Sequence, residues 1–180
     1  MDEEREGGLD NPTSYEELYS AHRQQVLRIC RVLLADRHEA EEVAQEVFLK
    51  MFRAYQTQDH TQAMDWKPWL TRVSVNACRD RRRTGGWKWW RLANIEYRET
   101  DHPSRGRTPE EEVLSRELQR HLWLAFRKLS ARQQEVFTLR YVEGFSTEEV
   151  AETLRMSAGS VKRHLFRAVH QLRRSLGDHL

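Results

Sequence analysis

The last third of the chain carries a pattern typical of two short helices joined by a tight turn. Glu149 follows Ser146 at the three-residue spacing of a capping box at a helix N-terminus. Ala151 is small enough for a second helix to cross closely, and the pattern places Gly159 in the turn, before Val161 opens that second helix. The segment therefore predicts a helix-turn-helix, whose second helix enters the major groove of DNA.

The second helix of this pair separates apolar from cationic residues. At about 100° per residue, one stripe of ordinary width collects Val161, Leu165, Val169, Leu172 and Leu176. No acidic residue occurs between Arg155 and Leu176, and Phe166 projects among the cations. A solvated basic face with one stray aromatic is the alternative. The cap, the turn and the charge asymmetry together favour a groove-binding face, where an aromatic ring can contact a thymine methyl group.

Charge is segregated along the 180 residues, although the formal net charge is only +2. The first forty-odd residues are rich in Asp and Glu, and the stretch around Glu110–Glu112 is acidic too. Residues 67–91 and the C-terminal segment are strongly basic. Two separate basic blocks predict two contacts with a polyanion.

Several functional classes lack support in the sequence. Cys30 and Cys78 lie in apolar helical patterns and are predicted to be buried thiols. The eight histidines show no ligand spacing with Cys or carboxylates, so we expect no metal site. No nucleophile–base constellation indicates an enzyme, and no cofactor motif occurs. No signal peptide or membrane-spanning apolar run is evident, so we expect a cytoplasmic protein that is not itself a membrane protein.

Helix start signals recur along the whole chain, and no segment shows sustained strand alternation, so the predicted fold class is all-α. The start signals are Ser14 with Glu17, Asp36 with Glu39, Thr108-Pro109 with Glu111, Ser130 with Gln133, and Ser146 with Glu149. Thr84-Gly85-Gly86 stops a helix, and periodicity is lost from there to Thr108. We predict two small helical domains at residues 12–86 and 108–178, joined by a flexible linker at 87–107.

Residues 39–50, 69–83 and 129–137, together with the helix-turn-helix, resemble the extracytoplasmic-function group of bacterial sigma-70 factors. The resemblance covers the chain from Tyr15 to Arg174. Members of that group are two-domain initiation factors that retain only conserved regions 2 and 4. The resemblance implies a protein that binds core RNA polymerase and directs promoter-specific transcription initiation, without enzymatic activity or a cofactor. It adds an anti-sigma factor as a candidate partner.

The first of these segments has one apolar residue outside its buried stripe. The stripe comprises Ala40, Val43, Ala44, Val47, Phe48, Met51 and Phe52. Leu49 lies nearly opposite, among Glu42, Gln45 and Glu46, as in a small docking surface with an acidic rim. A solvated acidic face with one exposed leucine fits the residues equally well. The resemblance implies that these four residues bind the coiled coil of the polymerase β′ subunit, and that region 4 meets the β subunit.

The second segment combines a buried stripe with an arginine-rich face. Trp66, Trp69, Leu70, Val73 and Ala77 form the stripe. Asn76 lies at its edge beside Arg72, Arg79 and Arg83, where an amide suits a base edge and guanidinium groups suit phosphates. The resemblance implies that this helix engages the −10 element on the non-template strand, and that the preceding loop, about 57–65, receives a flipped base. Asp80 is expected on the inner side of the helix, ordering the arginines.

The resemblance also implies that the C-terminal helix binds the −35 element. Lys162, Arg163, Phe166 and Arg167 fall on base-facing positions, and Arg140 falls on a phosphate-contacting one. The chain departs from the family pattern at three positions: Arg155 replaces the usual Gly, Arg163 the usual Ser, and His164 the usual Arg. If Arg155 adopts a positive φ, it carries a strain of about 1 kcal/mol.

Two questions stay open at the level of sequence. Trp87, Trp89 and Trp90 are interleaved with Lys88 and Arg91. They could anchor the linker in polymerase, stack on single-stranded DNA or be held by an inhibitory partner; the interpretation we favour is packing on the N-terminal domain. The alternative function is a free-standing helix-turn-helix regulator. That class needs a receiver or ligand-binding domain in the N-terminal half, where the sequence predicts only helices.

Overall fold

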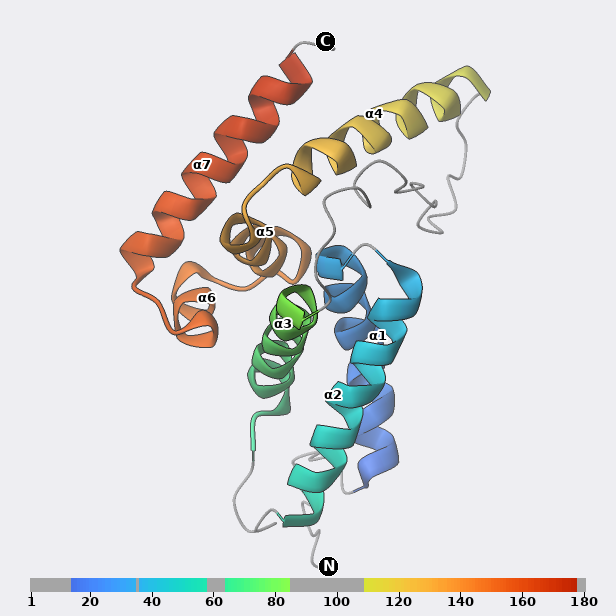
Figure 1. Ribbon diagram of the computed structural model, residues 1–180, viewed down its shortest axis with the longest axis vertical. Coiled ribbons are helices and arrows are strands. Elements are labelled where there is room, and N and C mark those ends of the chain that lie inside the picture. Colours follow the sequence, from blue (N-terminus) through green and yellow to red (C-terminus); the bar gives the residue numbers. More distant parts are fainter. Residues whose placement is uncertain (1–13, 35, 58–63, 85–108, 178–180) are drawn as a thin grey trace, which may run out of the picture.

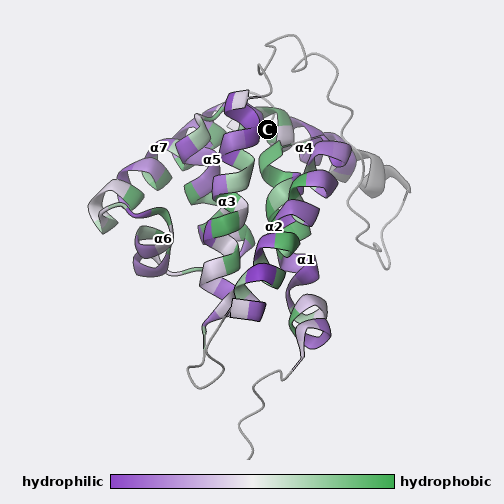
Figure 2. Ribbon diagram, turned by 60° about the horizontal axis from the view of Figure 1, so that its bottom comes forward, coloured by the Kyte–Doolittle hydropathy of each residue, from purple (hydrophilic) through white to green (hydrophobic). Residues whose placement is uncertain are grey.

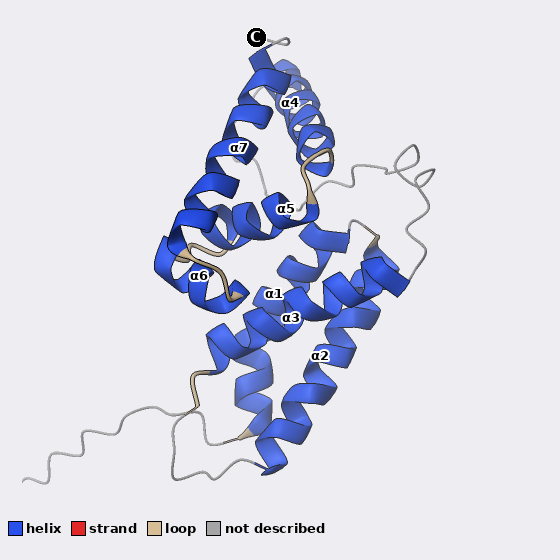
Figure 3. Cartoon of the chain, turned by 60° about the vertical axis from the view of Figure 1, so that its left-hand side comes forward, coloured by secondary structure: helices blue, strands red, loops and turns tan. Residues whose placement is uncertain are grey.

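The computed structural model describes residues 14–34, 36–57, 64–84 and 109–177, with side chains in the last range from Arg116 onward. Every regular element in these ranges is helical (Figure 3), which confirms the predicted all-α class. The helices are α1 (Tyr15–Leu34), α2 (Arg37–Thr57), α3 (Trp66–Thr84), α4 (Pro109–Arg127), α5 (Ala131–Phe137), a π-helical turn η2 (Thr138–Val142), α6 (Thr147–Leu154) and α7 (Ala158–Gly177). The predicted linker, with Trp87, Trp89 and Trp90, lies outside the described residues.

The first three helices pack against one another as an N-terminal unit (Figure 1). Local signals set where they begin: the Asp36 side chain accepts a hydrogen bond from the Glu39 amide at 2.9 Å, which caps α2. Ser14 and Glu17 exchange the two hydrogen bonds of a capping box ahead of α1. Polar and apolar residues alternate around each helix (Figure 2), so each helix turns an apolar stripe toward its neighbours.

The predicted helix-turn-helix is formed by α6 and α7. The Ser146 hydroxyl accepts from the Glu149 amide at 3.1 Å, and the Glu149 carboxylate accepts from the Ser146 amide at 2.6 Å. Arg155 ends α6 in the left-handed conformation, at φ 52° and ψ 56°, so it does turn with positive φ. The Met156 amide then donates to the Ala151 carbonyl at 2.9 Å.

The position predicted for Gly159 is wrong. The turn consists of residues 155–157, and Gly159 belongs to the first turn of α7. Ser157 starts that helix, because its hydroxyl accepts from the Ser160 amide at 3.1 Å. The left-handed residue of the turn is Arg155, at the position where the family resemblance expects a glycine.

One apolar core extends across both halves of the chain. Val136 of α5, Leu139 of η2 and Phe145 belong to the same buried cluster as Leu70 and Cys78 of α3. A second, smaller cluster joins α4 to α7 through Phe126, Leu129, Ala168 and Leu172, among others. Figure 1 accordingly shows α5 and α6 beside α3. Cys30 and Cys78 are buried free thiols, as predicted.

Candidate nucleic-acid and protein interfaces

The α7 candidate residues lie together on one exposed face. Lys162, Arg163, Phe166 and Arg167 are all exposed, and Phe166 leaves 73% of its surface accessible. The Phe166 ring stacks on that of His170, with centroids 6.2 Å apart and planes 10° from parallel. The opposite side of α7 is buried through Val161, Ala168 and Leu172, and this fixes which side faces outward.

Arg140 stands apart from this face. It is half-buried in η2, where its guanidinium donates to the Phe145 carbonyl at 3.2 Å and lies 5.9 Å from the Tyr141 ring centroid. Its position is set by the π-helical turn that follows α5 directly. Turns of this kind are frequent at functional sites.

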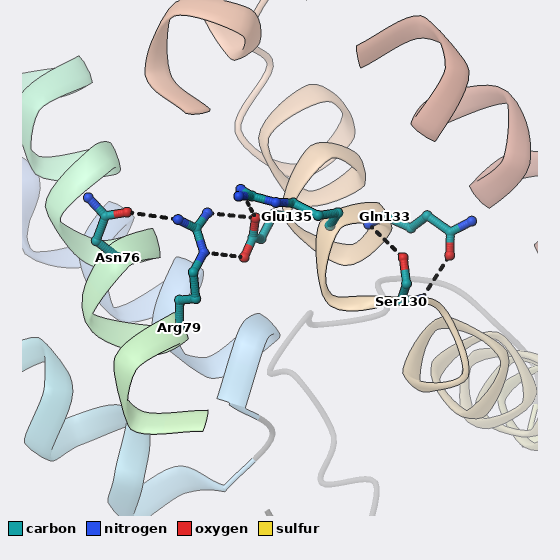
Figure 4. Close-up of polar contacts among 6 residues, drawn as sticks. Asn76, Arg79, Ser130, Gln133 and Glu135 are labelled. Carbon is teal, nitrogen blue, oxygen red and sulfur yellow. Dashed lines mark hydrogen bonds and ion pairs between the residues drawn. The ribbon is translucent and has the colours of Figure 1, made fainter. Parts of the chain in front are cut away.

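The α3 candidates are divided between exposed and engaged side chains. Asn76 and Arg83 are exposed, whereas Arg72 and Arg79 are half-buried. The Arg79 guanidinium contacts both carboxylate oxygens of Glu135 on α5, at 3.1 and 2.8 Å, and donates to the Asn76 side-chain oxygen at 3.2 Å (Figure 4). Only 2% of the Glu135 side chain is exposed, and Arg132 adds a further ion pair at 3.1 Å. The structure therefore joins Asn76 to Arg79, and Arg79 to a residue of the C-terminal half.

The position expected for Asp80 is wrong. Its side chain is exposed and pairs only locally, with Arg83 at 3.3 Å. Asp80 lies two residues beyond buried Cys78, which is about 200° around the helix, so it faces away from the core. It does order one arginine, but from the solvent side.

The acidic surface on α2 is exposed, and an arginine of α3 bridges it. Glu42, Gln45, Glu46 and Leu49 are all exposed, Leu49 by 58%. Arg81 pairs with Glu42 at 2.7 Å and with Glu46 at 2.8 Å. The hydrogen bond that Arg81 donates to Glu42 is the largest cause that raises the pKa of Arg81. Phe52, which the sequence places in the core, is 40% exposed, and its ring makes an edge contact with Tyr15 at 5.0 Å between centroids.

Further side chains that the sequence did not single out join the two halves. Arg28 of α1 makes two 2.7 Å contacts with the Glu143 carboxylate, which is 2% exposed. The hydrogen bond to Glu143 raises the pKa of Arg28. Arg28 and Glu143 are 115 residues apart in sequence, so no local sequence pattern predicts their contact.

The C-terminus of α1 receives two arginines from different helices. Arg82 of α3 and Arg127 of α4 both donate to the Leu33 carbonyl, and Arg127 also reaches the Val32 carbonyl at 3.3 Å. Terminal helix carbonyls have no partner within the helix, and the helix dipole favours cations there. Burial, reinforced by the charge of Arg82, lowers the pKa of Arg127 to about 10.

Neither a metal-binding cluster nor a membrane-spanning helix occurs among the described residues. No cluster of three or more His, Cys, Asp or Glu there could hold a metal ion. None of the helices described there combines the length and apolar character needed to cross a bilayer.

Comparison with known families matches both halves of the chain. Residues 18–88 match the family model for sigma-70 region 2, and residues 119–172 match that for sigma-70 region 4. The ECF RNA polymerase sigma factor SigW of Bacillus subtilis is 26% identical over 92% of this chain and 90% of its own length. The RNA polymerase sigma-E factor of Streptomyces coelicolor is 31% identical over 90% of this chain and 85% of its own.

Two solved structures share the fold. The sigma factor RpoE from Bartonella quintana, in complex with the anti-sigma factor NepR, superposes with a TM-score of 0.67 at 19% identity. It aligns with 91% of this chain and 96% of its own length. CnrH in complex with the cytosolic domain of CnrY gives a TM-score of 0.63 at 20% identity, covering 94% and 91% of the two chains.

Proposed function

Because the chain belongs to the extracytoplasmic-function sigma factors of RNA polymerase, we propose how its two regions divide promoter recognition between them. The protein directs transcription initiation by RNA polymerase, and sigma factors are not enzymes. We assign region 2 to residues 12–86 and region 4 to residues 108–178, with a linker at 87–107. The compartment in which such a factor meets polymerase is the cytoplasm.

Region 4 reads the −35 element through α7. The observation that carries this proposal is the exposed face formed by Lys162, Arg163, Phe166 and Arg167, on a helix whose other side is buried. Arginine can bind the O6 and N7 atoms of guanine together, and an aromatic ring can contact a thymine methyl group. Arg140, at the base of the helix-turn-helix, contacts a backbone phosphate and thereby sets the position of α7 on the duplex.

Region 2 engages the −10 element through α3, on the non-template strand. The Asn76 amide contacts a base of the opened strand, while Arg72, Arg79 and Arg83 contact its phosphates. The loop at about 57–65 receives a flipped base; residues 58–63 of it lie outside the described ones. Arg79 can act in this way only after its contact with Glu135 has been broken.

The exposed surface of α2 binds the coiled coil of the polymerase β′ subunit, and region 4 binds the β subunit. In this proposal Glu42 and Glu46 supply negative charge, and Leu49 supplies the apolar centre. Arg81 holds both carboxylates in place before polymerase arrives, which lowers the entropy cost of docking. An anti-sigma factor is a candidate regulator, since the RpoE structure that shares this fold is a complex with one.

Transcription reconstituted from purified components tests the proposal. The chain and core polymerase are given a promoter library randomised at both elements, and the transcribed templates are sequenced. We expect two selected motifs, with Arg163→Ala changing only the upstream one and Asn76→Ala only the downstream one. Failure of core polymerase to initiate with this chain would contradict the proposal and would favour a free-standing helix-turn-helix regulator.

A further inference from the structure

Phe166 is an aromatic side chain that the fold leaves in solvent. It is the most exposed of the large apolar side chains in the described part of the chain. The buried side of α7, which includes Val161, Ala168 and Leu172, lies on the other side of the helix. A phenylalanine at such a position contributes little to the core, and a free ring loses rotamer freedom whenever it binds a partner.

His170 already restricts the Phe166 ring. Its imidazole lies within 10° of parallel to the Phe166 ring, with 6.2 Å between centroids, which is the geometry of an offset-stacked pair. The two residues are four positions apart and therefore lie on the same side of α7, one turn from each other. His170 is itself exposed, so this contact is made on the outer side of the helix.

The direction of helical side chains determines which part of the Phe166 ring stays open. The Cα–Cβ bonds of an α-helix tilt toward its N-terminus, and aromatic side chains lean the same way. The His170 ring consequently backs the Phe166 ring from the C-terminal side. The open part of the Phe166 ring is turned toward the exposed Lys162 and Arg163, which we assign to base edges.

A phenylalanine ring without hydrogen-bonding groups recognises an apolar group of the DNA. In the major groove, thymine presents such a group, the C5 methyl. A ring that His170 holds in place loses less rotamer freedom on reaching this methyl group than a free ring does. The same pair adds little to the stability of the helix, because it is exposed and local. Its main effect is therefore expected on binding.

We propose that His170 is a positioning residue for base recognition, which holds the Phe166 ring for contact with the methyl group of a thymine in the −35 element. His170 acts by stacking on Phe166, and its charge is not required. This inference rests on the assignment of α7 to the −35 element. It adds the base that Phe166 selects and the residue that prepares Phe166 for it.

Removal of the methyl group alone provides the test. Each thymine of the −35 motif selected in the transcription library is replaced, one at a time, by deoxyuridine, which lacks only the C5 methyl group. The complex of the chain with core polymerase is titrated into each labelled duplex, and fluorescence anisotropy gives the Kd. The quantity compared is the methyl ratio, which is the Kd for the uracil duplex divided by the Kd for the thymine duplex.

With the unaltered chain, the methyl ratio should be about four at one thymine, the fold-change expected for burial of one methyl group. Phe166→Ala should lower this ratio to about one. His170→Ala should lower it to about two or less, because the cost of ordering the freed ring applies only when the contact is made. Circular dichroism should show the same helix content for these chains, since both side chains are exposed.

Two further replacements separate stacking from charge. His170→Phe retains a ring without a charge and should keep the methyl ratio at about four. His170→Lys retains a cation without a ring and should behave as His170→Ala does. A ratio that lysine restores and phenylalanine does not would overturn the proposal, because His170 would then act through its charge.

Arg173→Ala is the matched control. Arg173 is exposed seven residues beyond Phe166, which places it on the same side of α7. Loss of its charge should weaken binding to thymine and uracil duplexes equally, so the methyl ratio should stay at about four. A fall in the ratio as large as that of His170→Ala would overturn the proposal, since the effect would not depend on stacking.

The inference and the assignment on which it rests fail in different ways. If no −35 thymine gives a methyl ratio above about one, or if Phe166→Ala leaves the ratio unchanged, Phe166 does not contact a thymine methyl group and the inference falls. The effect of Arg163→Ala on the upstream motif then still tests whether α7 binds the −35 element. If Phe166→Ala removes the methyl effect and His170→Ala does not reduce it, the assignment stands and only the positioning role is wrong.

Discussion

The two candidate DNA-binding helices differ in whether their cationic side chains are already paired with other residues of the protein. On α7, Lys162, Arg163 and Arg167 are exposed, and none of them forms an ion pair within the described part of the chain. On α3, Arg79 is held by a buried carboxylate of the other region. The α7 residues proposed for duplex DNA are therefore all exposed, whereas one of the α3 residues proposed for an opened strand is engaged by a carboxylate of region 4.

Exposed charges and the buried charges between the two regions also differ in how much they contribute to stability. Exposed ion pairs contribute little, since water screens them and the side chains lose entropy. Buried carboxylates such as Glu135 and Glu143 are no longer hydrated. Removing an arginine partner therefore leaves a buried charge without compensation, which destabilises the folded protein. Contacts between the regions should consequently be sensitive to single substitutions, whereas the α7 face should tolerate them structurally and lose only its DNA binding.

The largest expected effect concerns α7. Arg163→Ala and Phe166→Ala should each reduce initiation on intact promoters by about 10-fold to 100-fold, because groove-edge contacts carry about 1–3 kcal/mol of discrimination. Tolerance to base changes should alter at particular −35 positions. Measured initiation rates on promoters with single −35 substitutions check both points.

The contrast with α3 appears on a template whose −10 element is already melted. Such a bubble should largely rescue Asn76→Ala, since the cost of unstacking has been removed, and it should not rescue Arg163→Ala. Equal rescue of both variants, or of neither, would show that the two helices do not divide the work as proposed.

An intermediate effect is expected at the α2 surface, which is exposed like α7 yet bridged by Arg81 like α3. Leu49→Ala and Glu46→Lys should weaken assembly with core polymerase about tenfold. Both residues lie off the core, so the free energy of unfolding should change by less than about 0.5 kcal/mol. Co-migration with core polymerase and thermal melting measure the two quantities.

Lys50→Ala, at the neighbouring exposed position of α2, is the matched control and should leave assembly as it was. Unfolding of Leu49→Ala would mean that this leucine serves the fold, and unchanged assembly would mean that polymerase docks elsewhere.

The smallest effect is expected in the turn of the helix-turn-helix. Arg155→Gly should stabilise the protein by about 1 kcal/mol or slightly less, because glycine adopts the left-handed conformation without the clash of a side chain. Gly144→Ala is the opposite change at φ 75° and should destabilise by a similar amount, although nothing crowds the added Cβ. Urea denaturation of the three chains gives both values, and stabilisation by both substitutions would contradict the strain argument.

Short-range sequence signals predicted much of the fold. The capping boxes at Ser130 and Ser146 form as expected, because each depends only on residues three positions apart. The same holds for the exposed basic face of α7, which follows from helical periodicity alone. Gly159 was wrongly placed in the turn because glycine is a usual turn residue, whereas Arg155, at the position where the family has a glycine, does adopt the left-handed conformation.

Long-range partners could not be predicted in this way. Arg79 and Glu135 are 56 residues apart, and each fits an ordinary solvated position on its own helix. Only the packing of the C-terminal half on α3 turns them into a partly buried pair. The sequence thus indicated the chemistry of the α3 face correctly as cationic with an amide, and no local pattern indicated that Glu135 of the same chain engages Arg79.

Promoter binding with and without core polymerase tests the account most directly. Fluorescence anisotropy at moderate salt would compare duplex promoter DNA with a scrambled duplex, for the chain alone and for its complex with core polymerase. We predict weak binding with little preference by the chain alone, and tight binding to the promoter by the complex, since polymerase holds the two regions at a fixed spacing. Tight, sequence-specific binding by the chain alone would contradict the account.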